Sequence, residues 1–300
     1  MRKPFAENFI KLAVRDKKII FLTGDLGFNA FEQLRETINT RFINAGVAEH
    51  NMASVAAGFA QAGYKPWIYS IAPFVTIKIL EELRNDICIH NRNVKIVGLG
   101  GGFDYGLAGP THHILQDVSL MLSLPNMTII APGFVDDIAP VIKQADKLIS
   151  PVYIRLTKGQ ETNFKVPIFK PIRKLIDGKK KTVVVFGSII IETLQAILKN
   201  KRMRDDFDVW LVCQFPINIP PELIRSIRNT GNLIIVEEHQ KSGSLGSALK
   251  DTVIDNKISL KSFHHLCVTG YKSNKYGSRQ FHLKENQLDS DSIYLTLKKD

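Results

Sequence analysis

One carboxylate at the start of a helix is the first group in this sequence whose position suggests chemistry. Residues 41–58 read RFINAGVAEHNMASVAAG, in which a β-branched and aromatic run and a glycine precede a small-residue helix beginning near Glu49. Four apolar residues at helical spacing predict the buried face of that helix: Met52, Val55, Ala56 and Phe59. Because ionising a carboxyl group next to an apolar face is costly, we expect Glu49 to be protonated part of the time and to donate a hydrogen bond. The alternative is that Glu49 only complements the positive end of the helix.

A second acidic group follows the first predicted strand. Residues 19–22 form an apolar run, and the polar turn Thr23-Gly24-Asp25-Leu26-Gly27 comes directly after it. Ligands of open α/β sheets bind at the carboxyl ends of parallel strands, so Asp25 is a candidate ligand-facing residue. A turn-capping role for Asp25 is the alternative.

Two adjacent imidazoles, His112 and His113, end a glycine-rich loop over residues 106–113. No Cys, Asp or Glu stands near them at the spacing of metal ligands, so the pair does not predict zinc. Proton transfer and hydrogen bonding to substrate oxygens suit such a pair better. The glycines at 100–102 allow close approach of a ligand or partner but lack the spacing of a dinucleotide fingerprint.

The elements that must position these groups alternate between strands and helices along the whole chain, which predicts an α/β fold with two doubly wound domains. The expected strands cover residues 19–22, 65–70, 94–98, 128–132, 152–156, 182–186, 209–213 and 233–236. The expected helices cover residues 5–15, 72–86, 114–124, 135–149 and 191–198, besides the one that starts near residue 48. We therefore expect a first domain over 1–160, a polar and basic linker over 161–181, and a second domain over 182–300.

Composition excludes several classes of protein. The chain has 300 residues, is 44% apolar and contains no apolar run long enough to cross a membrane, and its first residues lead directly into a helix, so neither a membrane span nor a signal peptide is predicted. Cys88, Cys213 and Cys267 lie in apolar runs without metal-ligand spacing, which indicates reduced core residues and a cytoplasmic protein. The net charge is +11, but aromatic residues do not alternate with the basic ones and no nucleic-acid-binding motif occurs. We therefore expect the basic residues to form a solvated flank of the linker or a surface that meets an acidic partner, and we expect no binding of nucleic acid.

Several short motifs, in this order and at these spacings, resemble the pyrimidine-binding half of transketolase-like thiamine diphosphate enzymes. They are Gly46-Val47-Ala48-Glu49-His50-Asn51-Met52, Tyr69-Ser70, Phe74, Arg84-Asn85-Asp86, Gly109-Pro110-Thr111-His112 and Pro125-Asn126-Met127. In the second half, Glu237-Glu238-His239 followed by Gly243-Ser244-Leu245-Gly246-Ser247 is similar to the family's C-terminal domain. That domain is mainly an assembly element in the family, so we expect its charged loop to be structural.

The resemblance implies roles for individual residues. Glu49 would hydrogen-bond the aminopyrimidine ring of the cofactor, Phe74 would stack on that ring, and Asp25 and His50 would lie close to the cofactor. The remaining candidates face the substrate: His112 as proton shuttle or hydrogen-bond donor, its neighbour His113, and Arg155 and Lys158 against an anionic group.

The resemblance also implies a missing half. In the family the cofactor's diphosphate is held through Mg²⁺ or Ca²⁺ by another domain, marked by a Gly-Asp-Gly run that this chain lacks. The chain would then be the small subunit of a split enzyme, active only with a large subunit that carries the metal ligands, in an α2β2 heterotetramer. Ala108, Gly100 and Leu122 replace polar or basic residues of ordinary transketolases, which implies a specialised sugar substrate.

Two alternatives remain open at this point. Decarboxylation of a 2-oxo acid, as in deoxyxylulose phosphate synthase or the beta subunits of 2-oxo acid dehydrogenases, is the nearest, although Arg84-Asn85-Asp86 and Pro125-Asn126-Met127 favour transketolase. The other is a non-catalytic scaffold derived from such an enzyme. Such a scaffold would need none of Glu49, Phe74 and His112, which together suggest a functional set.

Overall fold

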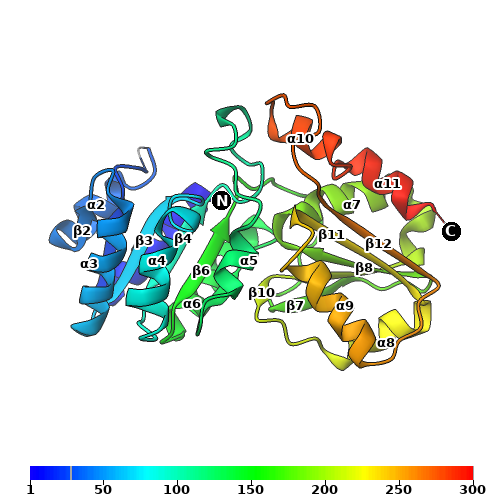
Figure 1. Ribbon diagram of the computed structural model, residues 1–300, viewed down its shortest axis with the longest axis horizontal. Helices are drawn as coiled ribbons and strands as arrows, with labels where there is room; N and C mark the ends of the chain where they lie inside the picture. Colours follow the sequence, from blue (N-terminus) through cyan, green and yellow to red (C-terminus); the bar gives the residue numbers. More distant parts are fainter. Residues whose placement is uncertain (28, 300) are drawn as a thin grey trace.

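Two sheets made mostly of parallel strands organise the chain, one in each half (Figure 1). The computed structural model describes residues 1–27 and 29–299, without the side chains of 201–203. The first sheet has seven strands in the order β10-β5-β6-β4-β3-β1-β2. Their bounds are β1 Ile19–Thr23, β2 Phe42–Asn44, β3 Lys65–Ile71, β4 Lys95–Leu99, β5 Thr128–Ile130, β6 Val152–Leu156 and β10 Gln214–Phe215. All five residues of β1, β4 and β6 are buried, as expected of central parallel strands covered on both faces.

Helices cover both faces of this sheet. The α-helices are α1 Arg2–Arg15, α2 Glu32–Ile38, α3 Glu49–Gln61, α4 Leu80–Glu82, α5 Asp117–Leu122 and α6 Ile138–Lys147. α1 turns Phe5 and Phe9 toward Trp67 of β3, with ring centroids 6.3 and 4.9 Å from the indole. Aromatic packing of this kind fixes the sheet whose strand ends carry the candidate site.

The second sheet has five strands in the order β12-β11-β8-β9-β7. Their bounds are β7 Ile172–Ile176, β8 Lys181–Phe186, β9 Phe207–Val212, β11 Asn232–Gln240 and β12 Ser262–Val268. Its α-helices are α7 Ile190–Leu198, α8 Pro221–Thr230, α9 Leu245–Asp255, α10 Arg279–Glu285 and α11 Ser290–Leu297. The α/β class and the doubly wound pattern expected from the sequence are confirmed in both halves.

Several expected details are wrong. β7 lies inside the segment 161–181 that we expected to be a linker, and it pairs antiparallel with β9. β10 comes from the second half of the chain but pairs antiparallel with β5 of the first sheet, so the two halves share a sheet. The expected helix over 72–86 is a turn, a 3-10 segment, the three-residue α4 and a π-helix over Leu83–Cys88. Val55 is 38% exposed, because α3 packs through its alanines and Met52 instead.

The residues Glu237, Glu238 and His239 are the buried end of β11 rather than the loop that we expected. Both carboxylate oxygens of Glu237 accept backbone N–H groups at the start of α9, from Leu245 at 3.1 Å and Gly246 at 2.9 Å. The imidazole of His265 on β12 lies 2.7 Å from Glu237 Oε1. This ion pair ties the first turn of α9 to two strands.

We expect this ion pair to make stability depend on pH. Burial opposes the charged imidazole, but the neighbouring Cys267 and the paired Glu237 carboxylate outweigh burial and raise the pKa of His265 to about 9. The stabilisation is fully present below the unfolded-state pKa of about 6.5 and is lost as pH rises toward 9, a change on the order of 1 to 2 kcal/mol after screening. Urea unfolding at pH 6 and pH 9.5 measures this change. In His265→Gln the free energy of unfolding should change less between these two pH values. The same change in the variant as in the unaltered chain would show that His265 is not its source.

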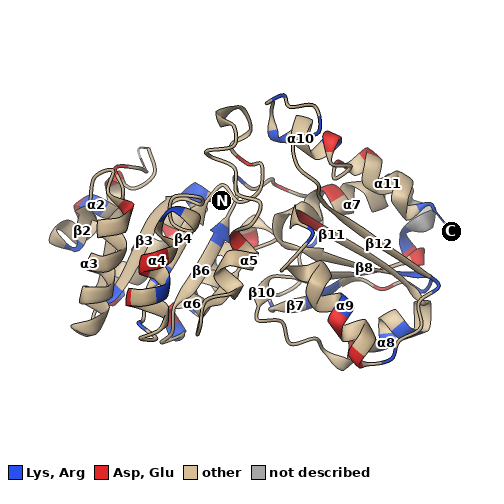
Figure 2. Cartoon of the chain, in the orientation of Figure 1, with Lys and Arg blue, Asp and Glu red and all other residues tan. Residues whose placement is uncertain are grey.

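The distribution of basic residues and the state of the cysteines can be compared with what the composition predicted. Lys and Arg residues are spread over both halves of the chain (Figure 2). Cys88, Cys213 and Cys267 are free and buried, as expected. Among residues 1–27 and 29–299, no helix has both the length and the apolar character that a membrane crossing requires.

Candidate active site

Glu49 is the first residue of α3 and is 2% exposed. It sits beside the carboxyl end of β1, where a Cβ on Gly24 would lie 3.3 Å from Glu49 Oε1. The other oxygen, Oε2, accepts a hydrogen bond from the ammonium of Lys78 at 2.5 Å. Within the described part of the chain, Oε1 has no hydrogen-bond partner. A buried carboxylate with one oxygen unpartnered is available to a ligand.

Lys78 was not expected from the sequence. Its ammonium is paired with Glu49, and its side chain is 38% exposed. The ammonium also lies 5.5 Å from the centre of the Phe74 ring. Its position four residues after Phe74 is the one feature of the sequence that could have suggested a role for Lys78. The ion pair with Glu49 joins residues 29 positions apart, so no local sequence pattern indicates it.

Phe74 is half-buried rather than part of the core, and His112 lies against it. The two ring centroids are 5.5 Å apart in an edge-on arrangement. The ring of Tyr105 also lies near His112, with the two ring centroids 5.8 Å apart. Glu49, Lys78, Phe74, His112 and Tyr105 thus form a continuous group, which we call the Glu49 site.

Asp25 and His50 lie at the edge of the Glu49 site. Asp25 has a φ of 55° and is bound to Asn44, whose Oδ1 accepts the Asp25 N–H at 2.9 Å. It lines a cavity of about 300 Å³ together with Arg35. His50 follows Glu49 on α3, is exposed, and contacts Glu82 Oε1 at 2.7 Å. Neither residue contacts Glu49 or Phe74 through a hydrogen bond or ion pair, and their roles beside the cofactor stay predictions.

The structure places His113 and Arg155 outside the Glu49 site, in contacts between the two halves. Arg155 is 3% exposed, its Nε donates to Asp117 Oδ2 at 2.7 Å, and its Nη2 donates to the carbonyl of Glu238 in the second half at 3.1 Å. His113 is 4% exposed and uses both ring nitrogens, at 2.9 Å from Tyr271 Oη and 2.8 Å from the Gly106 carbonyl. Substrate contacts by these two residues stay predictions that the geometry does not favour.

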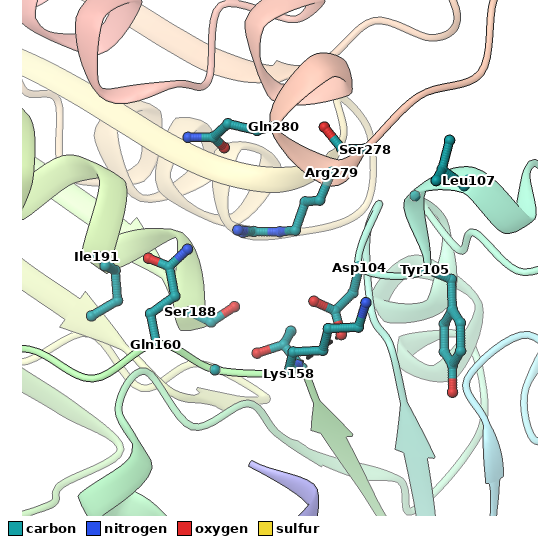
Figure 3. Close-up of a pocket in the computed structure, with 13 residues that line it drawn as sticks. Asp104, Tyr105, Leu107, Lys158, Gln160, Ser188, Ile191, Ser278, Arg279 and Gln280 are labelled. Carbon is teal, nitrogen blue, oxygen red and sulfur yellow. Dashed lines mark hydrogen bonds between the residues drawn. The ribbon is translucent and has the colours of Figure 1, made fainter.

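Lys158 lines a separate pocket of about 750 Å³ between the two halves (Figure 3). Its backbone N–H donates to Asp104 Oδ2 at 2.7 Å, whereas its ammonium forms no ion pair with the residues that the structure describes. Burial raises the pKa of Asp104, with Arg279 opposing that shift. Tyr105 lines this pocket and also touches His112, so the pocket adjoins the Glu49 site.

The Glu49 site fits the aminopyrimidine end of thiamine diphosphate. It offers an unpartnered oxygen on a buried carboxylate and an aromatic face that is not covered by the core. For the diphosphate end, no group of three or more His, Cys, Asp or Glu in residues 1–27 and 29–299 could hold a metal ion.

Comparisons with known proteins agree with these observations. The family model described as transketolase, pyrimidine binding domain, matches residues 1–162. One of the subunits of apulose-4-phosphate transketolase from Phocaeicola vulgatus is 28% identical over 269 residues, which are 87% of this chain and 85% of that protein. A transketolase C-terminal section from Methanocaldococcus jannaschii is 30% identical over 273 residues, 87% of this chain and 84% of that protein. A 1-deoxy-D-xylulose-5-phosphate synthase from Clostridium perfringens is 27% identical over 98% of this chain but only 48% of its own length.

Solved structures extend the similarity to the second half. A split gene transketolase, described as an inactive beta4 tetramer, superposes with a TM-score of 0.85 and 26% identity over 99% of this chain and 96% of that chain. Transketolase from Campylobacter jejuni has a TM-score of 0.76 at 15% identity, over 99% of this chain and 46% of that chain, which supports the fold alone. A family model that covers more than half of the residues, with a 30% identical relative along most of both chains, shows that this chain belongs to the transketolase family.

Proposed function

We propose that this chain is the small subunit of a heteromeric thiamine diphosphate-dependent transketolase that transfers a two-carbon ketol unit between sugars. The observation that carries the proposal is Glu49, a carboxylate 2% exposed at the first residue of α3, with Phe74 and His112 beside it. A thiamine diphosphate-dependent transferase is the class of enzyme to which the family points.

Each residue of the Glu49 site has a distinct part in this proposal. Thiamine diphosphate, when bound, supplies a thiazolium carbon that adds to a carbonyl and holds the bonding electrons of the transferred fragment. Glu49 binds and polarises the aminopyrimidine ring through Oε1, and Phe74 holds that ring by stacking. Lys78 keeps the other carboxylate oxygen fixed, and His112 holds or moves a proton at a substrate oxygen.

The proposal includes a large subunit. The expected metal, Mg²⁺ or Ca²⁺, would be held by oxygen ligands of that partner, and two copies of each chain would make an α2β2 heterotetramer. Two observations support it: relatives similar along most of both chains are named as one subunit or one section of a transketolase, and the beta4 tetramer of a split transketolase is described as inactive.

The substrate is proposed to be a specialised sugar. Ala108 and Leu107 present no charged group on the exposed tip of the loop before His112. Two relatives are named for apulose 4-phosphate rather than for an ordinary pentose phosphate, which supports this proposal. Kinetics in which ribose 5-phosphate is the preferred acceptor would contradict it.

Reconstitution tests the proposed function. The chain is co-expressed with the product of a neighbouring reading frame that carries the Gly-Asp-Gly run, and carbon dioxide release is measured with hydroxypyruvate and, separately, with pyruvate as donor. We expect release from hydroxypyruvate by the complex only. Release from pyruvate would favour the 2-oxo acid decarboxylating alternative, and activity of this chain alone would contradict the need for a partner.

A further inference from the structure

The segment that carries His112 is a closed loop over residues 100–116, which we call the His112 loop. Its two ends are joined by a bridge between Gly102 and Ile114, with N–H to carbonyl distances of 2.9 and 3.1 Å in the two directions. The tip beyond the bridge is fastened mainly to the second half of the chain. In Figure 1 it lies between the halves, beside the segment that leads into α10.

The first residue of the second half that holds the His112 loop is Glu238, at the end of β11. Its Oε1 accepts the backbone N–H of Phe103 at 2.8 Å, and its Oε2 accepts from Arg279 Nη2 at 2.6 Å. The approach is so close that a Cβ on Gly102, which has a φ of 72°, would lie 2.5 Å from Glu238 Oε1. Gly102 therefore admits a side chain of the second half, whereas a Cβ on Gly100 or Gly101 would meet Tyr105 or Arg155 of the first half.

The second residue that holds the His112 loop is Tyr271, in the segment after β12. The carbonyl of Gly106 can only accept, so His113 Nε2 donates to it. Burial lowers the pKa of His113, so the ring is neutral near pH 7 and its Nδ1 accepts the Tyr271 O–H at 2.9 Å. Tyr271 thereby completes the hydrogen bonding of a buried imidazole.

Aromatic packing fills the space around these hydrogen bonds. The rings of Phe103 and His282 are stacked with centroids 4.7 Å apart, and His113 packs edge-on against His282 at 5.1 Å. His112 is joined to His113 by a peptide bond, so the backbone of His112 is fixed wherever His113 is fixed.

We propose that Tyr271 and Glu238 are positioning residues that set His112 for catalysis through the His112 loop. The second half of the chain then takes part in the reaction of the Glu49 site, in addition to the assembly role that its resemblance implies. This inference rests on the proposed function for the role of His112. The contacts that hold the His112 loop against the second half can be tested in the isolated chain.

Tyr271→Phe tests the fastening. It keeps the ring and removes the hydroxyl, which leaves His113 Nδ1 buried without a partner, so we expect peptides covering residues 100–116 to exchange amide hydrogen faster in the isolated chain. The matched control is Tyr276→Phe, because Tyr276 is 56% exposed and packs edge-on against Tyr271. Equal exchange in both variants and the unaltered chain would overturn the inference.

A double-mutant cycle tests the link to His112. In the reconstituted complex, Tyr271→Phe should lower kcat about tenfold and leave KM near its original value, whereas Tyr276→Phe should change neither. In a His112→Ala background, Tyr271→Phe should lower kcat no further. An equal loss in both backgrounds would show that Tyr271 does not act through His112. Full turnover by Glu49→Gln would instead refute the proposed function. The two experiments therefore distinguish a failure of the positioning role of Tyr271 from a failure of the proposed function.

Discussion

Glu49→Gln is expected to lower kcat of the reconstituted complex by about 10² to 10⁴-fold, the range for removing a group that transfers or polarises a proton. The substitution keeps the size of the side chain and an acceptor oxygen for Lys78, which now donates to Glu49 Oε2 at 2.5 Å. An amide does not replace the carboxyl group as a proton-sharing partner of the ring. Steady-state kinetics with hydroxypyruvate as donor measure the loss.

Glu81→Gln is the matched control for this experiment. Glu81 lies on α4, close in sequence to Lys78, but it is exposed and is in no ion pair with the residues that the structure describes. We expect Glu81→Gln to retain normal turnover and both variants to bind the cofactor. Near-normal turnover by Glu49→Gln would remove the proposed mechanism.

Arg155→Met is expected to destabilise the chain rather than to weaken substrate binding. Arg155 and Asp117 are 3% and 0% exposed, and their ion pair is 2.7 Å long. Removing the guanidinium leaves a buried carboxylate whose remaining partner is the Tyr153 hydroxyl, so the free energy of unfolding should fall by about 3 to 5 kcal/mol. Urea unfolding of the isolated chain measures this change.

An exposed arginine provides the comparison. Arg225 pairs with Glu222 one turn away on α8 and is 67% exposed, so Arg225→Met should change stability by less than about 1 kcal/mol. Unchanged unfolding of Arg155→Met together with a raised KM for an anionic substrate would place Arg155 in the substrate site, as its sequence position first suggested.

The alternation of strands and helices could be predicted because central parallel strands are continuous apolar runs, as in Ile19–Thr23 and Val152–Leu156. β7 could not be predicted in this way. It is one of the two edge strands of the second sheet, and its two basic residues, exposed Lys174 and buried Arg173, are typical of a linker in the sequence. Arg173 is buried because it pairs with Asp137 of the first half, 36 residues away.

Within the site, Glu49 could be predicted because its place before a small-residue helix is a local feature of the sequence. Lys78 and the second-half contacts of the His112 loop could not be predicted, because they join residues that only the fold brings together. The bond from His113 to Tyr271 spans 158 residues, and no local pattern distinguishes that buried histidine from the half-buried His112 beside it.

The role of Glu49 is measured most directly by the rate at which thiamine diphosphate bound to the assembled complex exchanges its thiazolium C2 proton for deuterium. Glu49 is proposed to accelerate this exchange through the aminopyrimidine ring, so the rate should fall by at least about 100-fold in Glu49→Gln and stay unchanged in Glu81→Gln. Equal exchange rates in the Glu49→Gln and unaltered complexes would show that Glu49 does not activate the cofactor.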